Sequence, residues 1–317
     1  MIMIRVENLK KYFSSGVFRK KYIKAVDGIS FEIIKGETFG LVGESGCGKT
    51  TVGRLILRLI EPTEGKIFFK NINILGLSKE DLQKLRPKMQ IIFQDPDSSL
   101  NPRKKIGESI AEVLKLHKIV SKNKIKEKVI ELIEMVGLNP EHINRYPHEL
   151  SGGQNQRVAI ARVLAMNPEF IVADEPTSSL DLNVQAQILF LLRELQKKLG
   201  LTFLFISHNL EVIKVMADRI AVMYLGKLIE VGKTSEIFNG SKHPYTQALL
   251  SAVPVLDPEA KQKRKIVLEG EISNPINSPS GCRFHTRCPY REKICENIEP
   301  KMINIRDGHQ VACHLYS

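Results

Sequence analysis

The 317-residue sequence has only five cysteines and no tryptophan. It also has no uninterrupted run of ~18 apolar residues, the length that a membrane-spanning helix requires. The opening segment MIMIRVENLKKYF lacks the continuous apolar stretch and the small-residue cleavage site of a signal peptide. We therefore expect a cytoplasmic protein that does not cross a membrane, and such a protein rarely relies on a disulfide framework.

Several other features are missing. The sequence shows no internal duplication and no long heptad run, so we expect one copy of its catalytic unit and no long coiled coil. It has no aromatic-rich basic motif of the kind that binds RNA or DNA. It does have an excess of positive charge, with a formal net charge of +12. This charge favours an anionic partner such as a nucleotide, a nucleic acid or a membrane surface, while a solvated basic surface is the plainer interpretation.

The apolar pattern predicts an α/β protein. Buried strand-like runs such as EFIVADEP and LTFLFISH alternate with amphipathic helical runs, which is typical of a mainly parallel sheet covered on both faces. The helix that follows residue 49 is predicted to bury Val52, Leu55, Ile56 and Leu59 on one face. The run IAVMYLGKLIEVG is predicted to form a hairpin that turns near Gly226.

Composition predicts a division of the chain near residue 240. Residues 1–240 are expected to form one domain, with an N-terminal antiparallel β subdomain and a helical subdomain at about residues 98–160. Within that insertion one apolar stripe contains Ile125, Val129, Leu132, Ile133 and Val136. Residues 241–317 are rich in proline, asparagine and cysteine and show weak periodicity, so we expect a small loop-rich extension there.

The segment GESGCGKT matches the phosphate-binding pattern G-x-x-x-x-G-K-[ST], after a predicted strand and before a predicted helix. Its glycines let successive backbone N–H groups converge on an oxyanion at the positive end of the helix. Lys49 is expected to reach the β- and γ-phosphates, and the Thr50 hydroxyl to ligate Mg²⁺. An ordinary glycine-rich turn is the alternative. The residues expected to contact the nucleotide are Gly43, Ser45, Gly46, Cys47, Gly48, Lys49, Thr50 and Thr51.

Two carboxylates follow one of the buried strands. The run Phe170–Asp174 is apolar up to Asp174, and Glu175 comes next. Ligands of such sheets bind at the carboxyl ends of the strands. Asp174 is expected to hold Mg²⁺, and Glu175 to polarise an attacking water molecule. Alternatively, the two acids simply face solvent at the end of a strand.

The segment Ser151-Gly152-Gly153-Gln154 completes a pattern that resembles the ABC-type ATPases over roughly residues 1–240. The resemblance implies a P-loop fold and a head-to-tail dimer in which this signature segment faces the ATP of a second subunit. Gln94 resembles the glutamine that contacts Mg²⁺ and the γ-phosphate, and Asp181 resembles the aspartate of the loop that follows the catalytic acid. His208 resembles the switch histidine, with a buried core histidine as the alternative interpretation.

Three further positions bear on this resemblance. Tyr12 resembles the aromatic residue that stacks on adenine, and Tyr22 is a weaker candidate for the same role. Asn155 stands where the family more often has arginine, and Ser179 where it has alanine. Neither replaced residue supplies a catalytic group, so we expect ATP hydrolysis to survive both departures.

Two segments, QDPDSSLNPR and HPYTQALLSAVP, resemble more narrowly the ATP-binding subunits of bacterial dipeptide and oligopeptide importers. This resemblance implies a peripheral position on the cytoplasmic face of the cell membrane. It also implies two membrane permease subunits, a solute-binding receptor and a second ATP-binding subunit, which is either a paralogue or a second copy. Related importers carry nickel or other small solutes. A different class, the ABC-type ATPases that act on nucleic acid without a membrane, usually has two cassettes or a long coiled coil; we expect no nucleic acid partner.

Four of the five cysteines lie at the C-terminal end with the spacing C-x5-C-x6-C-x17-C, at about residues 277–317. Four thiolates suit either tetrahedral Zn²⁺ or an iron–sulfur cluster, and these loops are wider than those of common zinc knuckles. The family resemblance implies a [4Fe-4S] cluster that folds the tail, and free or disulfide-linked thiols are a further alternative. We expect the tail to fold separately from the ATP site. The expected ligands are Cys282, Cys288, Cys295 and Cys313.

Overall fold

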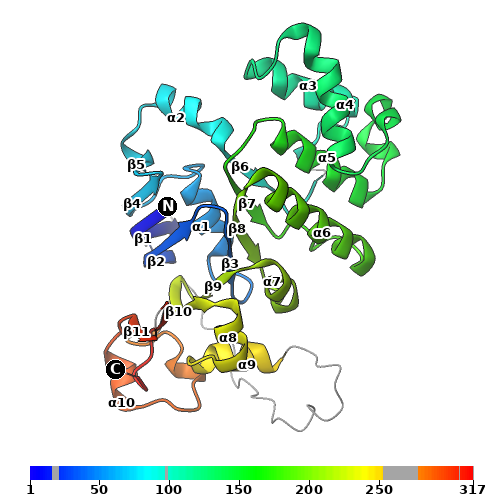
Figure 1. The fold of residues 1–317 in the computed structure, drawn as a ribbon. Helices are drawn as coiled ribbons and strands as arrows, with labels where there is room; N and C mark the ends of the chain where they lie inside the picture. Colours follow the sequence, from blue (N-terminus) through cyan, green and yellow to red (C-terminus); the bar gives the residue numbers. More distant parts are fainter. Residues whose placement is uncertain (16–20, 97–98, 253–277, 307, 317) are drawn as a thin grey trace. The chain divides into compact units, whose positions relative to one another are not determined.

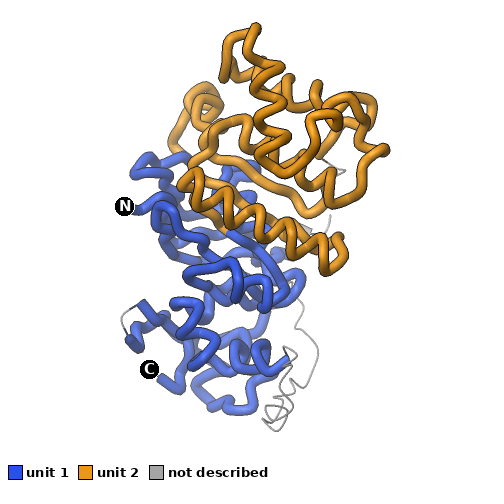
Figure 2. The backbone as a smooth tube through the Cα atoms, turned by 45° about the vertical axis from the view of Figure 1, so that its right-hand side comes forward, with its two compact units in different colours: residues 1–75, 205–317 blue, residues 76–204 orange. Residues whose placement is uncertain are grey.

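A computed structural model describes residues 1–15, 21–96, 99–252, 278–306 and 308–316. The chain forms two compact units, of which unit 1 comprises Met1–Leu75 with Phe205–Ser317 and unit 2 comprises Gly76–Leu204 (Figure 2). No helix in the described part of the chain combines the length and the apolar character needed to cross a membrane. The strand β8 (Thr202–Ser207) and the short 3-10 helix η1 (Ile74–Gly76) each contain a boundary between the units.

Unit 1 begins with an antiparallel sheet of strand order β2-β1-β4-β5. Apolar residues explain its first strand, since Ile4 and Val6 of β1 are buried on either side of the more exposed Arg5. The pairing of β1 with β2 contains register shifts, one of them between Lys11 and Tyr12. The strands are β1 (Ile2–Ser15), β2 (Lys21–Ile34), β4 (Glu64–Phe69) and β5 (Ile72–Asn73).

The second sheet of unit 1 has the order β11-β12-β10-β9-β3. The strand β3 is buried along its whole length and pairs with β9 in parallel, whereas β9 and β10 form the predicted antiparallel hairpin around Gly226. The strands β11 and β12, at one edge of this sheet, come from the cysteine-rich tail. The strands are β3 (Thr38–Val42), β9 (Arg219–Tyr224), β10 (Lys227–Lys233), β11 (Ile303–Arg306) and β12 (His309–Val311).

Helices complete unit 1 (Figure 1). Val52, Leu55 and Ile56 of α1 are fully buried, as predicted, and each such side chain contributes ~1.5–3 kcal/mol to stability. Leu59 was predicted on the same face, but it is 46% exposed because α1 ends at Ile56 and Arg58 has a φ of 48°. The helices are α1 (Lys49–Ile56), α7 (Leu210–Met216), α8 (Thr234–Gly240), α9 (Pro244–Ser251), α10 (Lys293–Asn297) and the 3-10 helix η9 (His285–Arg287).

Glu230 of β10 ties three segments of unit 1 together. Its carboxylate is completely buried and accepts hydrogen bonds from the backbone N–H groups of Lys242 at 2.6 Å and His243 at 3.0 Å. It also lies 2.8 Å from Nε2 of His309 in β12. A buried carboxylate needs such partners because losing its hydration is costly. Lys242, His243 and His309 are therefore held against β10, although the sequence around them has weak periodicity.

Unit 2 contains a parallel pair of strands, β6 and β7, and a helical part formed by α3, α4 and α5. The predicted stripe on α4 is buried throughout, with Ile133 and Val136 at 0% exposure. The strands are β6 (Met89–Ile92) and β7 (Phe170–Asp174). The helices are α2 (Lys79–Leu85), α3 (Ile106–Leu116), α4 (Ile125–Met135), α5 (Gly152–Leu164) and α6 (Leu182–Leu199), with 3-10 turns η2 (Arg86–Lys88), η4 (Lys122–Lys124), η5 (Pro140–Asn144) and η6 (Pro147–Glu149).

Candidate nucleotide-binding site

The predicted phosphate-binding segment forms a tight loop between β3 and α1 in unit 1. Two of its glycines are required by space. A Cβ on Gly43 would lie 2.2 Å from the backbone oxygen of Met223, and a Cβ on Gly48 would lie 2.1 Å from that of Ala25. Gly48 also has a φ of 111°, a backbone conformation that glycine adopts readily. The surrounding backbone therefore fixes the path of the loop.

Lys49 closes this loop from inside. Its side chain is 5% exposed, and Nζ donates hydrogen bonds to the backbone oxygens of Gly43 at 2.7 Å and Glu44 at 3.0 Å. Cys47 lies beside it, with Sγ 3.8 Å from Nζ, and burial raises the pKa of its thiol. Ser45 and Gly46 are exposed at the tip of the loop.

The first turn of α1 supplies the remaining predicted contacts. Thr50 and Thr51 lie there, both half-buried, and no acidic residue is present in this turn. The positive end of the helix is thus not neutralised by a carboxylate of its own, which favours the binding of an anion.

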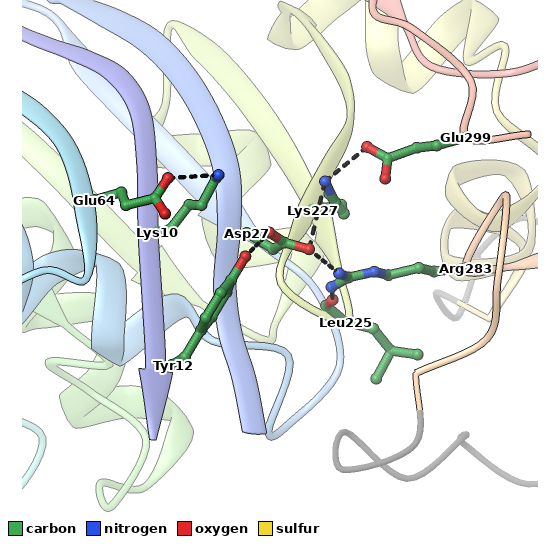
Figure 3. A network of polar contacts seen from close by, with 8 residues as sticks. All are labelled: Lys10, Tyr12, Asp27, Glu64, Leu225, Lys227, Arg283 and Glu299. Atoms are coloured by element: carbon green, nitrogen blue, oxygen red, sulfur yellow. Dashed lines mark hydrogen bonds and ion pairs between the residues drawn. The ribbon is translucent and has the colours of Figure 1, made fainter. Parts of the chain in front are cut away.

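Tyr12 lies on β1 of the same unit, and its hydroxyl is already hydrogen-bonded within the protein. Its hydroxyl donates a hydrogen bond of 2.5 Å to Asp27 on β2, and burial together with that carboxylate raises the pKa of Tyr12 above its usual range (Figure 3). Although burial opposes it, the hydrogen bond from Tyr12 and the charges of Lys227 and Arg283 hold the pKa of Asp27 below its usual value. The rival candidate, Tyr22, is 52% exposed.

In unit 2 the two predicted carboxylates follow one another at the end of β7. Asp174 is the last residue of the strand and is 7% exposed. Glu175 has a φ of 49°, the left-handed region that non-glycine residues seldom occupy. Its backbone oxygen accepts hydrogen bonds from the N–H and the hydroxyl of Ser178. Such local strain is common at functional positions, where the surrounding turn holds it in place.

The segment Ser151–Gln154 begins α5. Ser151 is the N-cap, its hydroxyl accepts from the N–H of Gln154 at 3.3 Å, and the Gln154 side chain accepts from the N–H of Ser151 at 2.9 Å. This reciprocal capping box fixes the start of the helix. A Cβ on Gly153 would lie 2.4 Å from Cγ1 of Val184, so the turn also packs tightly against α6.

The two departures from the family pattern have different surroundings. Asn155 is 4% exposed, and its Nδ2 donates a hydrogen bond of 3.0 Å to the backbone oxygen of Pro147. It therefore anchors the turn before the signature segment. Ser179 is exposed. Asp181 caps α6, because its carboxylate accepts from the N–H groups of Asn183 and Val184.

Gln94 and His208 are both exposed and both lie just beyond strands. β6 ends at Ile92, so Gln94 lies two residues past the end of that strand. His208 directly follows β8, and its exposure makes the alternative of a buried core histidine wrong. Residues 97 and 98 of the segment QDPDSSLNPR, and the end of HPYTQALLSAVP, lie outside the described residues.

The four tail cysteines line one small cavity in unit 1. Burial raises the pKa of Cys282 to about 11 and also raises the pKa values of Cys288 and Cys313. The nearby His285 and His314 each have one ring nitrogen 2.8 Å from a backbone oxygen. Within the described residues, no group of three or more histidine, cysteine or acidic side chains is arranged so that it could hold a metal ion. The geometry therefore gives no support to the predicted zinc or iron–sulfur site.

Sequence reasoning missed the residues of the C-terminal extension, within unit 1, that contact the phosphate loop. Tyr245 of α9 accepts a hydrogen bond of 3.0 Å from the N–H of Glu44, and Arg287 of η9 forms an ion pair with the Glu44 carboxylate. The Tyr245 ring packs against Tyr224 and Phe284. A usable signal was present, since an arginine adjoins each of the first two tail cysteines.

Comparisons with known proteins agree with the geometry. Residues 26–178 match the family described as ABC transporter, and residues 229–295 match the oligopeptide/dipeptide transporter C-terminal region. The oligopeptide transport ATP-binding protein AppF of Bacillus subtilis is 51% identical over 99% of this chain and 98% of its own. The dipeptide transport ATP-binding protein DppF of Haemophilus influenzae is 47% identical over 98% of this chain and 96% of its own.

Solved structures show the same fold. The ATP-binding cassette MJ0796, determined as a dimer in a post-hydrolysis state with ADP and Pi, matches with a TM-score of 0.66 and 32% identity, covering 73% of this chain and 99% of that one. CbiO1 from Clostridium perfringens, part of the transporter complex cbiONQ, matches with a TM-score of 0.66 and 30% identity over 75% of this chain and 91% of its own. With a phosphate loop, a capped signature turn and a carboxylate pair in family order, the chain belongs to the ABC transporter family and is one of its ATPases.

Proposed function

We propose that this chain hydrolyses ATP to drive the import of dipeptides or oligopeptides as the ATP-binding subunit of a membrane transporter. The observation that carries the proposal is the match of residues 229–295 to the C-terminal region of oligopeptide and dipeptide transporters, together with relatives of that name along nearly the whole chain. The same likeness supports a position on the cytoplasmic face of the membrane, reached through partner subunits.

The proposed chemistry divides among the site residues. The loop N–H groups and Lys49 bind the β- and γ-phosphates of ATP, and Tyr12 stacks on the adenine. Glu175 orients the water that attacks the γ-phosphorus, and Gln94 and His208 respond to the γ-phosphate. Phosphoryl transfer of this kind needs mainly positioning and charge stabilisation. The left-handed backbone of Glu175 at the end of β7 is the kind of strained conformation that is common at functional positions, which supports this role.

The residues proposed to hold Mg²⁺ are Thr50, Asp174 and Gln94. Their oxygen atoms are the hard ligands that Mg²⁺ prefers, and Asp174 is buried at a strand end, as a magnesium-binding carboxylate should be. When bound, Mg²⁺ neutralises charge on the transferred phosphoryl group.

The proposed assembly has two ATP-binding subunits, two permease subunits and a solute-binding receptor. The capped turn at Ser151–Gln154 leaves a helix N-terminus for the γ-phosphate of the second subunit's ATP, which supports a head-to-tail pair. The related cassette MJ0796, 32% identical to this chain, was solved as a dimer bound to ADP and Pi. We propose that 1–240 forms the cassette of each subunit.

Transport by the complete complex in proteoliposomes tests the function. We expect ATP-dependent uptake of a labelled dipeptide or oligopeptide, and Glu175→Gln should keep ATP binding while cutting hydrolysis by ~10²-fold or more. The matched control is Glu211→Gln on α7, which should hydrolyse ATP at the normal rate. Uptake of a metal ion with no uptake of any peptide would replace the proposed solute, and an unchanged rate in Glu175→Gln would remove Glu175 from its role.

The tail cysteines carry a finer proposal, a [4Fe-4S] cluster. Four cysteines are the usual ligand set of such a cluster, and all four line one cavity, although the described side chains are not arranged to hold a metal ion. When bound, the cluster would supply folding energy to the tail. Iron and sulfide analysis of anaerobically purified protein tests this proposal. About four of each per chain would support it, whereas zinc alone, or no metal, would overturn it.

A further inference from the structure

The phosphate loop is held from outside by the cysteine-rich tail. Glu44, its second residue, does not belong to the glycine, lysine and threonine pattern that binds phosphate. Its carboxylate nevertheless accepts hydrogen bonds from both terminal nitrogens of Arg287, from Nη1 at 2.9 and 3.3 Å and from Nη2 at 3.2 Å. The Arg287 side chain is only 7% exposed. A two-pronged pair of this kind fixes direction as well as distance.

The backbone of the same residue is held too. The N–H of Glu44 donates to the hydroxyl of Tyr245, which is a fully buried residue of α9. Nη1 of Arg287 also lies 3.5 Å from the hydroxyl oxygen of Tyr224, and the Tyr224 ring packs against Tyr245. Both the side chain and the backbone of Glu44 are thus fixed by residues that follow the strand hairpin of the cassette. None of these contacts involves a residue assigned to phosphate or Mg²⁺.

A second arginine of the tail, Arg283, binds the carboxylate that also accepts the hydrogen bond from Tyr12 (Figure 3). The buried guanidinium of Arg283 donates to the carboxylate of Asp27 and to the backbone oxygen of Leu225. Asp27 in turn accepts the hydrogen bond from Tyr12, the residue expected to stack on adenine. Lys227 joins the network, with Nζ 3.6 Å from Asp27 and 2.6 Å from Glu299 of the tail. The tail therefore touches both the phosphate loop and the support of Tyr12.

We propose that Arg287 is a positioning residue for ATP binding, which acts through Glu44 to hold the phosphate loop in its binding shape. Arg283 acts in the same way on Tyr12 through Asp27. The physical reason is preorganisation: a loop that is already ordered does not have to lose conformational freedom when ATP binds, so its affinity is higher. This inference concerns nucleotide affinity alone and holds whatever solute the transporter carries. It also replaces the expectation that the tail can unfold without affecting ATP binding.

Equilibrium binding of a non-hydrolysable ATP analogue with Mg²⁺ to the full chain tests the proposal. Arg287→Ala should weaken binding by about tenfold, the effect of losing a hydrogen-bonded charge pair. Arg287→Lys keeps the charge but loses the planar fork, so it should recover part of that affinity. Arg291→Ala is the matched control, because Arg291 is an exposed arginine of the same tail, and it should bind as the wild type does.

A double-mutant cycle separates positioning from mere attachment of the tail. If Arg287 acts through Glu44, then Glu44→Gln should weaken binding by a similar factor, and the double variant should be no worse than either single variant. Glu44→Gln leaves the tail sequence intact, so it tests the loop even if Arg287→Ala unfolds the tail. Normal affinity in Arg287→Ala, or losses that multiply in the double variant, would overturn the proposal. Failure of peptide uptake would leave these binding results unaffected.

Discussion

The phosphate loop and the signature turn are both proposed to bind an anion at a helix N-terminus, yet they are stabilised in opposite ways. The turn at Ser151–Gln154 is fixed by its own capping box, formed within four residues. The loop at Gly43–Lys49 depends on distant residues: Ala25 and Met223 limit its path, and the tail holds Glu44. Local hydrogen bonds therefore stabilise the signature turn, whereas tertiary contacts stabilise the phosphate loop. Changes far away in the sequence should therefore affect the loop and leave the turn alone.

Removing the internal support of the loop should have the largest effect on this contrast. Lys49→Ala loses two hydrogen bonds to loop oxygens and the positive charge that is proposed to bind the phosphates. We expect ATP affinity to fall by about tenfold to a hundredfold, since hydrogen bonds to charged groups are worth ~1.5–3 kcal/mol each. Calorimetric titration with ATP and Mg²⁺ measures this loss. Lys66→Ala, at an exposed lysine of β4, is the control, and an equal loss there would show a general charge effect instead.

A pair of glycine substitutions should give an intermediate effect that differs between the sites. In Gly48→Ala the new Cβ meets backbone at 2.1 Å in a strained φ region, which costs ~1–3 kcal/mol for the conformation alone. In Gly153→Ala the nearest atom belongs to the Val184 side chain, which can move. We expect a larger fall in thermal stability and in ATP affinity for Gly48→Ala. Equal losses in both measurements would contradict the comparison.

The smallest effect is expected at the cap of the signature turn. Ser151→Ala removes the hydroxyl that accepts from Gln154, which should lower the free energy of unfolding by ~1 kcal/mol. Because the cap acts locally, the affinity of the phosphate loop for ATP should not change in the monomeric chain, where the signature turn meets no ATP of a second subunit. Denaturant unfolding and ATP titration of the same sample measure both quantities. Ser151→Thr should restore the stability, and a weakened ATP affinity in Ser151→Ala would show that the two sites are coupled.

The same contrast explains what could be predicted from sequence. The strand Phe170–Asp174, the stripe on α4 and the hairpin around Gly226 follow from local periodicity, so the α/β fold was confirmed. Ser151 and Gln154 form a capping box whose spacing is visible in the sequence. The roles of the individual site residues stay predictions.

Other features could not be predicted because they depend on residues far apart in the chain. Arg287 and Glu44 are separated by 243 positions, and Arg283 and Asp27 by 256, so no local pattern connects them. The helix α9 and the strands of the tail have weak apolar periodicity. Hydrogen bonds and aromatic packing with distant residues order them instead, and the sequence does not show these contacts. The exposure of Leu59 follows from the end of α1, which apolar spacing alone does not mark.

The buried carboxylate of Glu230 has a consequence for building chimeric transporters. Glu230 binds the backbone at Lys242 and His243 and the side chain of His309. The extension therefore cannot be exchanged between proteins as a separate segment that begins after residue 240. A donor extension grafted at that point would have to match a host carboxylate that it did not evolve with. A junction placed before β10 would transfer Glu230 together with its hydrogen-bond partners. We expect that chimera to be expressed as folded protein and the chimera joined at residue 240 to precipitate.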